Sequence, residues 1–515
     1  MSKHSFFNGA LILMIAGFIV KIMGFFYRIY LSNLLGAEGM GVFGLITPVY
    51  SLVLITLTSG LSIAVSSMVS FEMAKKMPSN AKKITNLSMV ILFIISTLTA
   101  FLLYIFLEVL VTKILKDNRT FLPLLVFIPS LPFITISSAL KGYFYGISNV
   151  TPNAIAQIVE QSVRIISVIF LVKTIPNISI TYACTFAMLG MILSELANLF
   201  VLFGFYLKNK SYNTAPCPFR KRATTKNIII LSSSISFNKL ITSLMSTIET
   251  IFIPSKLMLY GLSYQESISL FGKLSGMAMP LILFPSLVTN SLATTLIPAI
   301  SEGLAKKDYK SINTRISKSI QLSLGMGFIF MVTFMVFPSE IGSFIYKKEN
   351  ISTMLYMLSF SCPLVYLNQI LLGILNGLNE QKFSLITSII CYTIRILFVF
   401  FIIPRLGISG YIIGFISSLA LNCLLNLSII IKNTCLIINL KHWVFMPSII
   451  SILMLIINKY TQIFVKMFNF NHNLTTILTV GSSLFIFCIL MILARVFPIN
   501  EIFRILGLKR NNPLK

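Results

Sequence analysis

The sequence predicts an all-α integral membrane protein with about fourteen transmembrane helices, arranged as two six-helix lobes in parallel repeat and two extra C-terminal helices. Three observations predict this class: an apolar composition, a series of apolar runs, and a correspondence between the two halves of the chain. Of the 515 residues, 56% are hydrophobic and 11% are charged. Soluble domains carry about 25% charged residues. The composition therefore excludes a disordered chain and argues strongly against a large soluble domain.

The apolar runs are long enough to cross a bilayer, which takes about 20 mainly apolar residues. No gap between runs could hold a soluble domain, and the longest polar connection covers 208–227. The first run continues past Lys21 without a small-residue cleavage site, so we expect a retained helix rather than a signal peptide. The predicted runs are 7–30, 42–70, 84–108, 120–140, 153–173, 180–207, 228–252, 268–300, 316–337, 352–377, 383–403, 408–431, 442–464 and 474–497.

The basic residues indicate how the helices are oriented. Lys and Arg number 41 against 14 Asp and Glu, a net charge of +27. Most Lys and Arg lie in the short connections between the predicted helices. The connections on the same side of the membrane as the N-terminus hold more of them than the connections on the opposite side. Cytoplasmic connections are enriched in Lys and Arg. We therefore expect both termini in the cytoplasm, and we expect no nucleic-acid partner.

An internal repeat appears when the chain is aligned with itself so that Gly41 falls on Gly272. At this single offset Gly146 falls on Gly377, and Arg164 on Arg395. Two halves of six helices share one orientation, and such parallel repeats are typical of transporters with a substrate site at the repeat interface. A duplication that serves only stability is the alternative. The predicted parts are an N-terminal lobe (1–207), a basic cytoplasmic linker (208–227), a C-terminal lobe (228–432), and two further helices with a cytoplasmic tail (433–515).

Basic residues within the predicted helices suggest a substrate-binding cavity. A charge at the helix centre costs roughly 2.5–3.5 kcal/mol on the insertion scale, so such residues usually face a cavity or a partner. A basic cavity favours anionic groups such as pyrophosphate, to which Lys and Arg donate charge-assisted hydrogen bonds. The candidate substrate-binding residues are Lys21, Arg28, Arg164, Lys239, Lys273 and Arg395.

Three acidic residues in the helices are candidates for tuning these cations or for ion coupling: Glu160, Glu249 and Glu195. Glu160 stands four residues before Arg164, the favourable order for an ion pair on one helix face.

Plainer interpretations stay open for several of these residues. Glu160 and Arg164 could form a purely structural pair, and Glu195 could bond Asn198. Lys239 could extend to the cytoplasmic surface, and Arg28 and Lys273 could lie at the outer interface.

No enzyme or cofactor signature is present. The chain has no P-loop and no HExxH motif, and no His lies in the polar helix faces to serve as a base. The seven Cys show no CxxC spacing and the three His are far apart, so we expect no metal site. Transport would draw on an ion gradient, the membrane potential or the substrate gradient.

Several motifs resemble the family of stage V sporulation protein B. They are GYFYG at 142–146, TPNAIAQ at 151–157, EQSVR at 160–164, LSGMAMP at 274–280 and LIPAISE at 296–302. GAEGMG at 36–41 is similar to the wider polysaccharide flippase group. The resemblance covers essentially the whole chain and implies membership of the multidrug/oligosaccharidyl-lipid/polysaccharide exporter superfamily.

The resemblance implies two six-helix lobes around a central cavity. In the related lipid II flippase, basic residues of helices one and eight line that cavity. Lys21 and Lys273 match two of them, and a further arginine falls on Tyr27, with Arg28 next to it. Both matched positions hold Lys, a point charge rather than a planar two-pronged donor, which changes how pyrophosphate would be contacted.

We therefore expect a flippase for an undecaprenyl-pyrophosphate-linked saccharide, lipid II or a close peptidoglycan precursor. The resemblance implies a role in spore cortex synthesis, in the cytoplasmic (inner) membrane of a spore-forming bacterium. The expected partners are this lipid-linked anionic saccharide, membrane lipids and cell-wall synthases. The alternatives are a cation-coupled multidrug exporter and a non-transporting scaffold for cell-wall enzymes.

Overall fold

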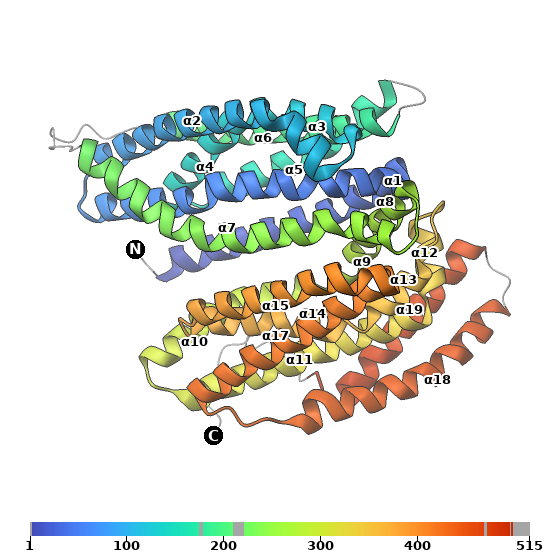
Figure 1. Ribbon diagram of the computed structural model, residues 1–515. Coiled ribbons are helices and arrows are strands. Elements are labelled where there is room, and N and C mark those ends of the chain that lie inside the picture. Colours follow the sequence, from blue (N-terminus) through green and yellow to red (C-terminus); the bar gives the residue numbers. More distant parts are fainter. Residues whose placement is uncertain (1–2, 175–178, 210–220, 468–470, 495, 498–515) are drawn as a thin grey trace. The chain divides into compact units, whose positions relative to one another are not determined.

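The computed structural model describes residues 3–174, 179–209, 221–467, 471–494 and 496–497. Over these residues the chain forms helices and no strand, which confirms the all-α class (Figure 1). The described residues fall into two compact units. One holds the residues up to Ser255 together with Tyr264–Gly272, and the other holds Lys256–Ser263 together with the residues from Lys273 onward.

The first unit is built from long helices, of which α1 is broken at Gly36. This glycine has φ 65°, a value that glycine adopts without steric cost. The break divides α1 into two helices, which match the predicted runs 7–30 and 42–70. The elements are α1 (Lys3–Ala74), α2 (Pro78–Val109), η1 (Leu110–Leu115), η2 (Asn118–Thr120), α3 (Phe121–Phe127), η3 (Ile128–Ser130), α4 (Leu131–Gly146), α5 (Thr151–Thr174), α6 (Ile180–Lys208), α7 (Lys221–Leu259) and α8 (Tyr264–Gly272).

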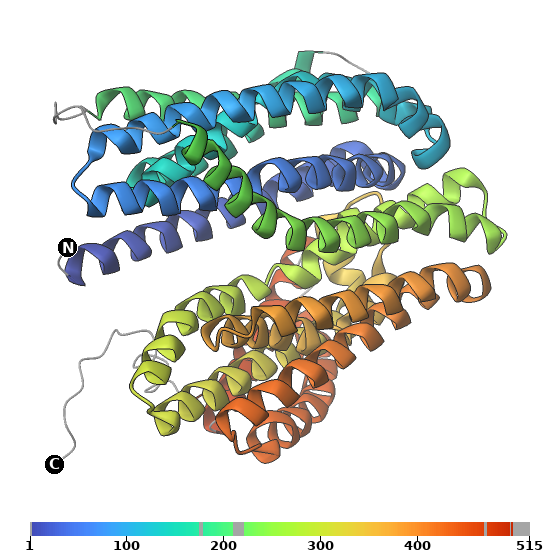
Figure 2. The same cartoon turned by 60° about the vertical axis from the view of Figure 1, so that its left-hand side comes forward.

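The second unit contains the bent pair α13 and α14, which meet with a bend of 52°, and α10 is bent by 58° from the stretch Tyr264–Leu283 that precedes it. Figure 2 shows the elements of the second unit, coloured yellow-green to red, in a view turned about the vertical axis from that of Figure 1. They are η4 (Lys273–Ala278), α9 (Met279–Leu283), α10 (Ser286–Ala305), α11 (Tyr309–Val336), α12 (Pro338–Ile345), α13 (Ser352–Ser359), α14 (Cys362–Gly377), α15 (Gln381–Phe401), α16 (Ile403–Leu406), α17 (Ile408–Thr434), η5 (Lys441–Phe445), α18 (Met446–Lys466) and α19 (His472–Leu493).

Ten helices in the described part are long and apolar enough to cross a membrane, or up to twelve if each bent pair is one span. The chain is thus a multi-pass membrane protein, but the predicted count of fourteen is not confirmed. In this count α1 enters once although it covers two predicted runs, and α7, which covers the run 228–252, does not enter. Residues 210–220 of the predicted linker lie outside the described residues, and α7 begins at Lys221, before the predicted run.

Each unit has an apolar core of its own and an apolar outer surface. Val65, Phe144 and Leu202 are buried in the first unit, as Ile320 and Leu371 are in the second. Large apolar side chains remain exposed along the helices, among them Phe101, Phe170, Phe200, Leu424 and Phe485. An exposed apolar surface of this extent is expected where lipid tails cover the protein.

The two units share local geometry at the offset of the sequence repeat. Lys76 and its counterpart Lys307 both follow a helix with left-handed φ, at 60° and 56°, and Ser148 and Asn379 do so at 58° and 62°. The helix contacts repeat as well. A Cβ at Gly142 would lie 2.6 Å from the Ser62 carbonyl oxygen, and one at the equivalent Gly373 would lie 2.8 Å from that of Ala293. The internal repeat is therefore present in the fold as well as in the sequence.

Within the first unit, α8 of the second repeat packs directly on α1. A Cβ at Gly272 would overlap the carbonyl oxygen of Ala37, and one at Gly41 would overlap that of Ile268. The two contacts are equivalent in the repeat, because position 37 corresponds to 268 and position 41 to 272. Reciprocal contacts of this kind are those of a two-fold axis.

Gly272→Ala is expected to destabilise the protein, because the added methyl group has no space beside Ala37. Overpacking of this kind costs about 1–3 kcal/mol. Gly17→Ala is the matched control, since nothing lies within 4 Å of its Cβ position. Alanine favours a helix over glycine by about 1 kcal/mol, so the control should be unchanged or slightly more stable. Melting temperatures of the detergent-purified variants test this, and equal values for both would contradict the close contact.

Candidate functional site

Glu160 is the centre of a polar cluster inside the first unit. Its Oε1 accepts a hydrogen bond from Arg164 Nη2 at 2.6 Å, one turn along α5. Its Oε2 accepts one from Asn198 Nδ2 of α6 at 2.5 Å, and Lys141 Nζ of α4 lies 3.9 Å from the same oxygen. The predicted ion pair on α5 is thus formed, and two neighbouring helices add donors to it.

Arg164 is held from two sides. Besides its bond to Glu160, its Nε donates to Ser194 Oγ of α6 at 3.2 Å. The side chains of Arg164 and Glu160 are 18% and 16% exposed. The pair therefore lies largely within the unit, where each charge compensates the other. Its role in substrate binding stays a prediction.

Glu195 lies beside this cluster without joining its hydrogen bonds. The residue is 8% exposed, and its Oε2 is buried with no hydrogen-bond partner among the described residues. Asn198 donates to Glu160 and accepts from Ser137 Oγ at 3.3 Å. The sequence left open a hydrogen bond between Glu195 and Asn198. In the structure Asn198 donates to Glu160 instead.

The candidates on α1 and α7 differ in exposure. Lys21, Arg28 and Lys239 are exposed, whereas Glu249 is 4% exposed. Gly24, on the same face of α1 as Lys21 and Arg28, faces α5, where Gln161 Nε2 lies 3.6 Å from its Cβ position. The side chains of 221–236 on α7 lie outside the described residues.

The two candidates of the second unit lie in different surroundings. Lys273 Nζ, at the start of η4, is 3.1 Å from Glu349 Oε2 in the connection between α12 and α13. The Arg395 guanidinium lies over the Tyr392 ring at 4.3 Å and near the Phe415 ring at 5.7 Å. Arg395 is the repeat counterpart of Arg164, but the position of Glu160 is occupied by Cys391 in the second repeat.

A second ionic cluster of the first unit was not predicted. Arg119 of η2 binds Asp117 at 2.8 Å and Glu38 of α1 at 2.6 Å, and Tyr264 Oη of α8 donates to Asp117 at 2.8 Å. Burial acts to raise the pKa of the Asp117 carboxyl, but hydrogen bonds from Arg119 and Tyr264 together hold it below its usual range. The sequence signal for this cluster was limited to Glu38 inside the GAEGMG motif, 81 residues from Arg119.

Glu160→Ala is expected to destabilise the first unit, because it leaves Arg164 and Lys141 without their shared carboxylate. Removing one partner of a buried ion pair costs about 3–5 kcal/mol. The double variant Glu160→Gln/Arg164→Leu should be less destabilised, since it removes both charges. Thermal melting of the three proteins in detergent measures this, and a single variant as stable as wild type would show that the pair does not hold the helices together.

Comparisons with known proteins agree with this architecture. The family described as polysaccharide biosynthesis protein matches residues 6–304, and the MatE family matches residues 237–401. Stage V sporulation protein B of Bacillus subtilis (strain 168) is 30% identical over 458 residues, which cover 88% of each chain. Lipid II flippase MurJ of the same organism is 25% identical over 458 residues, which cover 80% of each chain.

Solved structures show the same fold. Lipid II flippase MurJ in an inward closed conformation aligns with a TM-score of 0.71 at 16% identity, covering 94% of this chain and 99% of that one. An inward-facing multidrug resistance MATE family transporter of the MOP superfamily aligns with a TM-score of 0.63 at 15% identity, covering 81% and 94%.

Proposed function

This chain belongs to the polysaccharide biosynthesis protein family of membrane transporters, and from that premise we propose that it is a flippase for a lipid-linked saccharide. The proposed substrate is an undecaprenyl-pyrophosphate-linked saccharide, lipid II or a close peptidoglycan precursor. Its relatives carry the names of a lipid II flippase and of a sporulation protein. We therefore place the activity in spore cortex synthesis, where cell-wall synthases would use the exported head group.

The observation that carries the proposal is the set of cations within membrane helices. Lys21 and Arg28 are exposed on one face of α1, and Arg164 and Arg395 hold equivalent positions in the two repeats. Desolvated Lys and Arg bind phosphate oxygens through charge-assisted hydrogen bonds. A pyrophosphate needs several such donors at once, and a neutral substrate needs none.

The proposed roles of these residues follow from their surroundings. Lys21 and Arg28 attract the diphosphate first, together with Lys239 and Lys273. Arg164 and Lys141 together carry one charge more than Glu160, and this excess attracts the diphosphate in the first repeat. Glu160, Glu249 and Glu195 tune the cations or take part in ion coupling. The lobes then rock, with both termini in the cytoplasm, and release the head group outside.

Lys21→Ala is expected to slow flipping of lipid II about tenfold, the effect of losing about 1.4 kcal/mol of contact to the substrate. The assay measures the access of an added enzyme to lipid II head groups in liposomes that contain the pure protein. Lys113→Ala is the matched control, since it removes an exposed lysine of η1 outside the proposed cavity. If Lys21→Ala flips lipid II as fast as the control does, the proposed role of Lys21 is wrong.

A cation-coupled drug exporter is the second candidate, favoured by the buried and unbonded carboxyl oxygen of Glu195. A carboxylate of this kind suits a protein that binds a cation or a proton during its cycle. In this case Glu195→Gln would abolish efflux of an organic cation dye, while the basic residues would be dispensable. Dye efflux and lipid II access measured on the same liposomes separate the two functions.

A further inference from the structure

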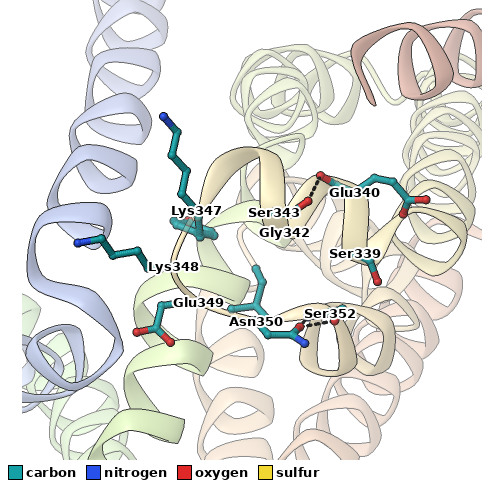
Figure 3. A pocket seen from close by; sticks show the side chains of 11 residues that line it. Ser339, Glu340, Gly342, Ser343, Lys347, Lys348, Glu349, Asn350 and Ser352 are labelled. Atoms are coloured by element: carbon teal, nitrogen blue, oxygen red, sulfur yellow. Dashed lines mark hydrogen bonds between the residues drawn. The ribbon is translucent and has the colours of Figure 1, made fainter. Parts of the chain in front are cut away.

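A pocket of about 510 Å³ opens in the second unit, where α12 connects to α13. Its charged lining residues are Lys347, Lys348, Glu349 and Glu340, and Asn350 and three serines complete its polar surface. Figure 3 shows the two lysine side chains extending away from Glu340, and Glu349 beneath them. A volume of this size is within the range of pockets that hold small ligands, roughly 300–1,000 Å³.

The pocket has a rigid frame. Tyr346 is 1% exposed and its Oη donates to the Met277 carbonyl oxygen of η4 at 3.2 Å. The side chain of Asn350 accepts from the backbone N–H of Ser352 at 3.0 Å and so caps the start of α13. Ile351 is also buried. The lining residues therefore sit on a fixed backbone, and the site is preorganised for a ligand.

The lining chemistry suits a saccharide that carries negative charge. Hydroxyl, amide and carboxylate groups bond sugar hydroxyls, and lysines bond phosphate or carboxylate groups. Lys347 and Lys348 are exposed, and neither forms an ion pair with another described residue. Glu349 instead pairs with Lys273 at 3.1 Å, which links the pocket to a predicted substrate-binding residue.

The repeat shows what is special about this connection. The sequence Lys116-Asp117-Asn118-Arg119 of the first repeat corresponds to Lys347-Lys348-Glu349-Asn350 of the second. In the first unit Arg119 forms ion pairs with Asp117 of the same connection and with Glu38 of α1. In the second unit both partners of the Arg119–Asp117 pair have changed, to Asn350 and Lys348. The internal ion pair is lost and two exposed lysines stand in its place.

We propose that this pocket binds the anionic saccharide head group on the outer side of the membrane, as the station that the substrate reaches after Lys273. The inference rests on the proposed function and on the charge bias that places this connection outside. An arriving phosphate competes with Glu349 for Lys273, and Lys347 and Lys348 then donate to the phosphate while the polar lining binds the sugar. The ligand class is a sugar that bears phosphate or carboxylate and is joined to a lipid.

Lysine footprinting of the full chain in nanodiscs tests the binding. A water-soluble acetylating reagent modifies exposed lysines, and mass spectrometry measures the rate at Lys347 and Lys348 against Lys116, the repeat counterpart of Lys347. The probes are a short-chain lipid II analogue, N-acetylglucosamine 1-phosphate and uncharged N-acetylglucosamine. We expect the two charged probes to protect Lys347 and Lys348 and to leave Lys116 unchanged, with the lipid analogue acting at lower concentration.

Three results would overturn the proposal: no protection by either charged probe, equal protection by the uncharged sugar, or equal protection of Lys116. Protection by the sugar phosphate alone would also overturn it, because the pocket would then serve a soluble ligand.

The variant Lys347→Gln/Lys348→Gln links the pocket to transport. We expect its affinity for the lipid analogue to fall about a hundredfold, since two contacts to an anion are lost and each is worth about tenfold. Lys116→Gln is the matched control and should bind as wild type does. In the double variant, footprinting measures the acetylation rate of Lys273. We expect this rate to be the same with and without the lipid analogue.

The proposal and the proposed function fail in different ways. If wild type flips lipid II and the double variant flips it at the same rate with unchanged affinity, the pocket proposal is wrong and the flippase stands. If wild type flips no lipid II but the charged probes still protect Lys347 and Lys348, the proposed function is wrong and the pocket remains a site for an anionic sugar, without its place in transport.

Discussion

The free energy of a charge in hydrocarbon is the constraint on which this structure depends. An Arg or Glu within a membrane helix requires a partner or water, because lipid offers neither hydrogen bonds nor screening. Glu160 satisfies that requirement for three helices at once, since its two oxygens hold Arg164 on α5 and Asn198 on α6, with Lys141 of α4 nearby. The helices of the first unit are therefore positioned by polar contacts as well as by apolar packing.

The two repeats use one backbone plan with different charges. Helix ends, glycine contacts and the connections between helices recur at the offset that aligns Gly41 with Gly272. Several charged positions do not recur, since Cys391 stands where Glu160 would be expected and Asn350 where Arg119 would be. A shared frame with unlike charges therefore gives the two repeats different chemistry.

Much of the fold could be predicted from the sequence because its signals are local. Apolar runs indicated the helices, and the spacing of Glu160 and Arg164 predicted an ion pair that the structure contains. The number of spans was not confirmed, in part because α1 counts as one element although it holds two helices that meet at Gly36. The pairs Arg119–Glu38 and Lys273–Glu349 join distant parts of the chain, and no periodicity in the sequence announces them.

The end of α8 has a consequence for Lys273. The glycine contacts fix the register of α8 on α1, whereas η4, which follows at once, is a π-helix, with hydrogen bonds that run from i to i+5. Lys273 stands at the first position of this wider turn, so a small change in the winding of η4 would redirect its side chain while α8 keeps its register.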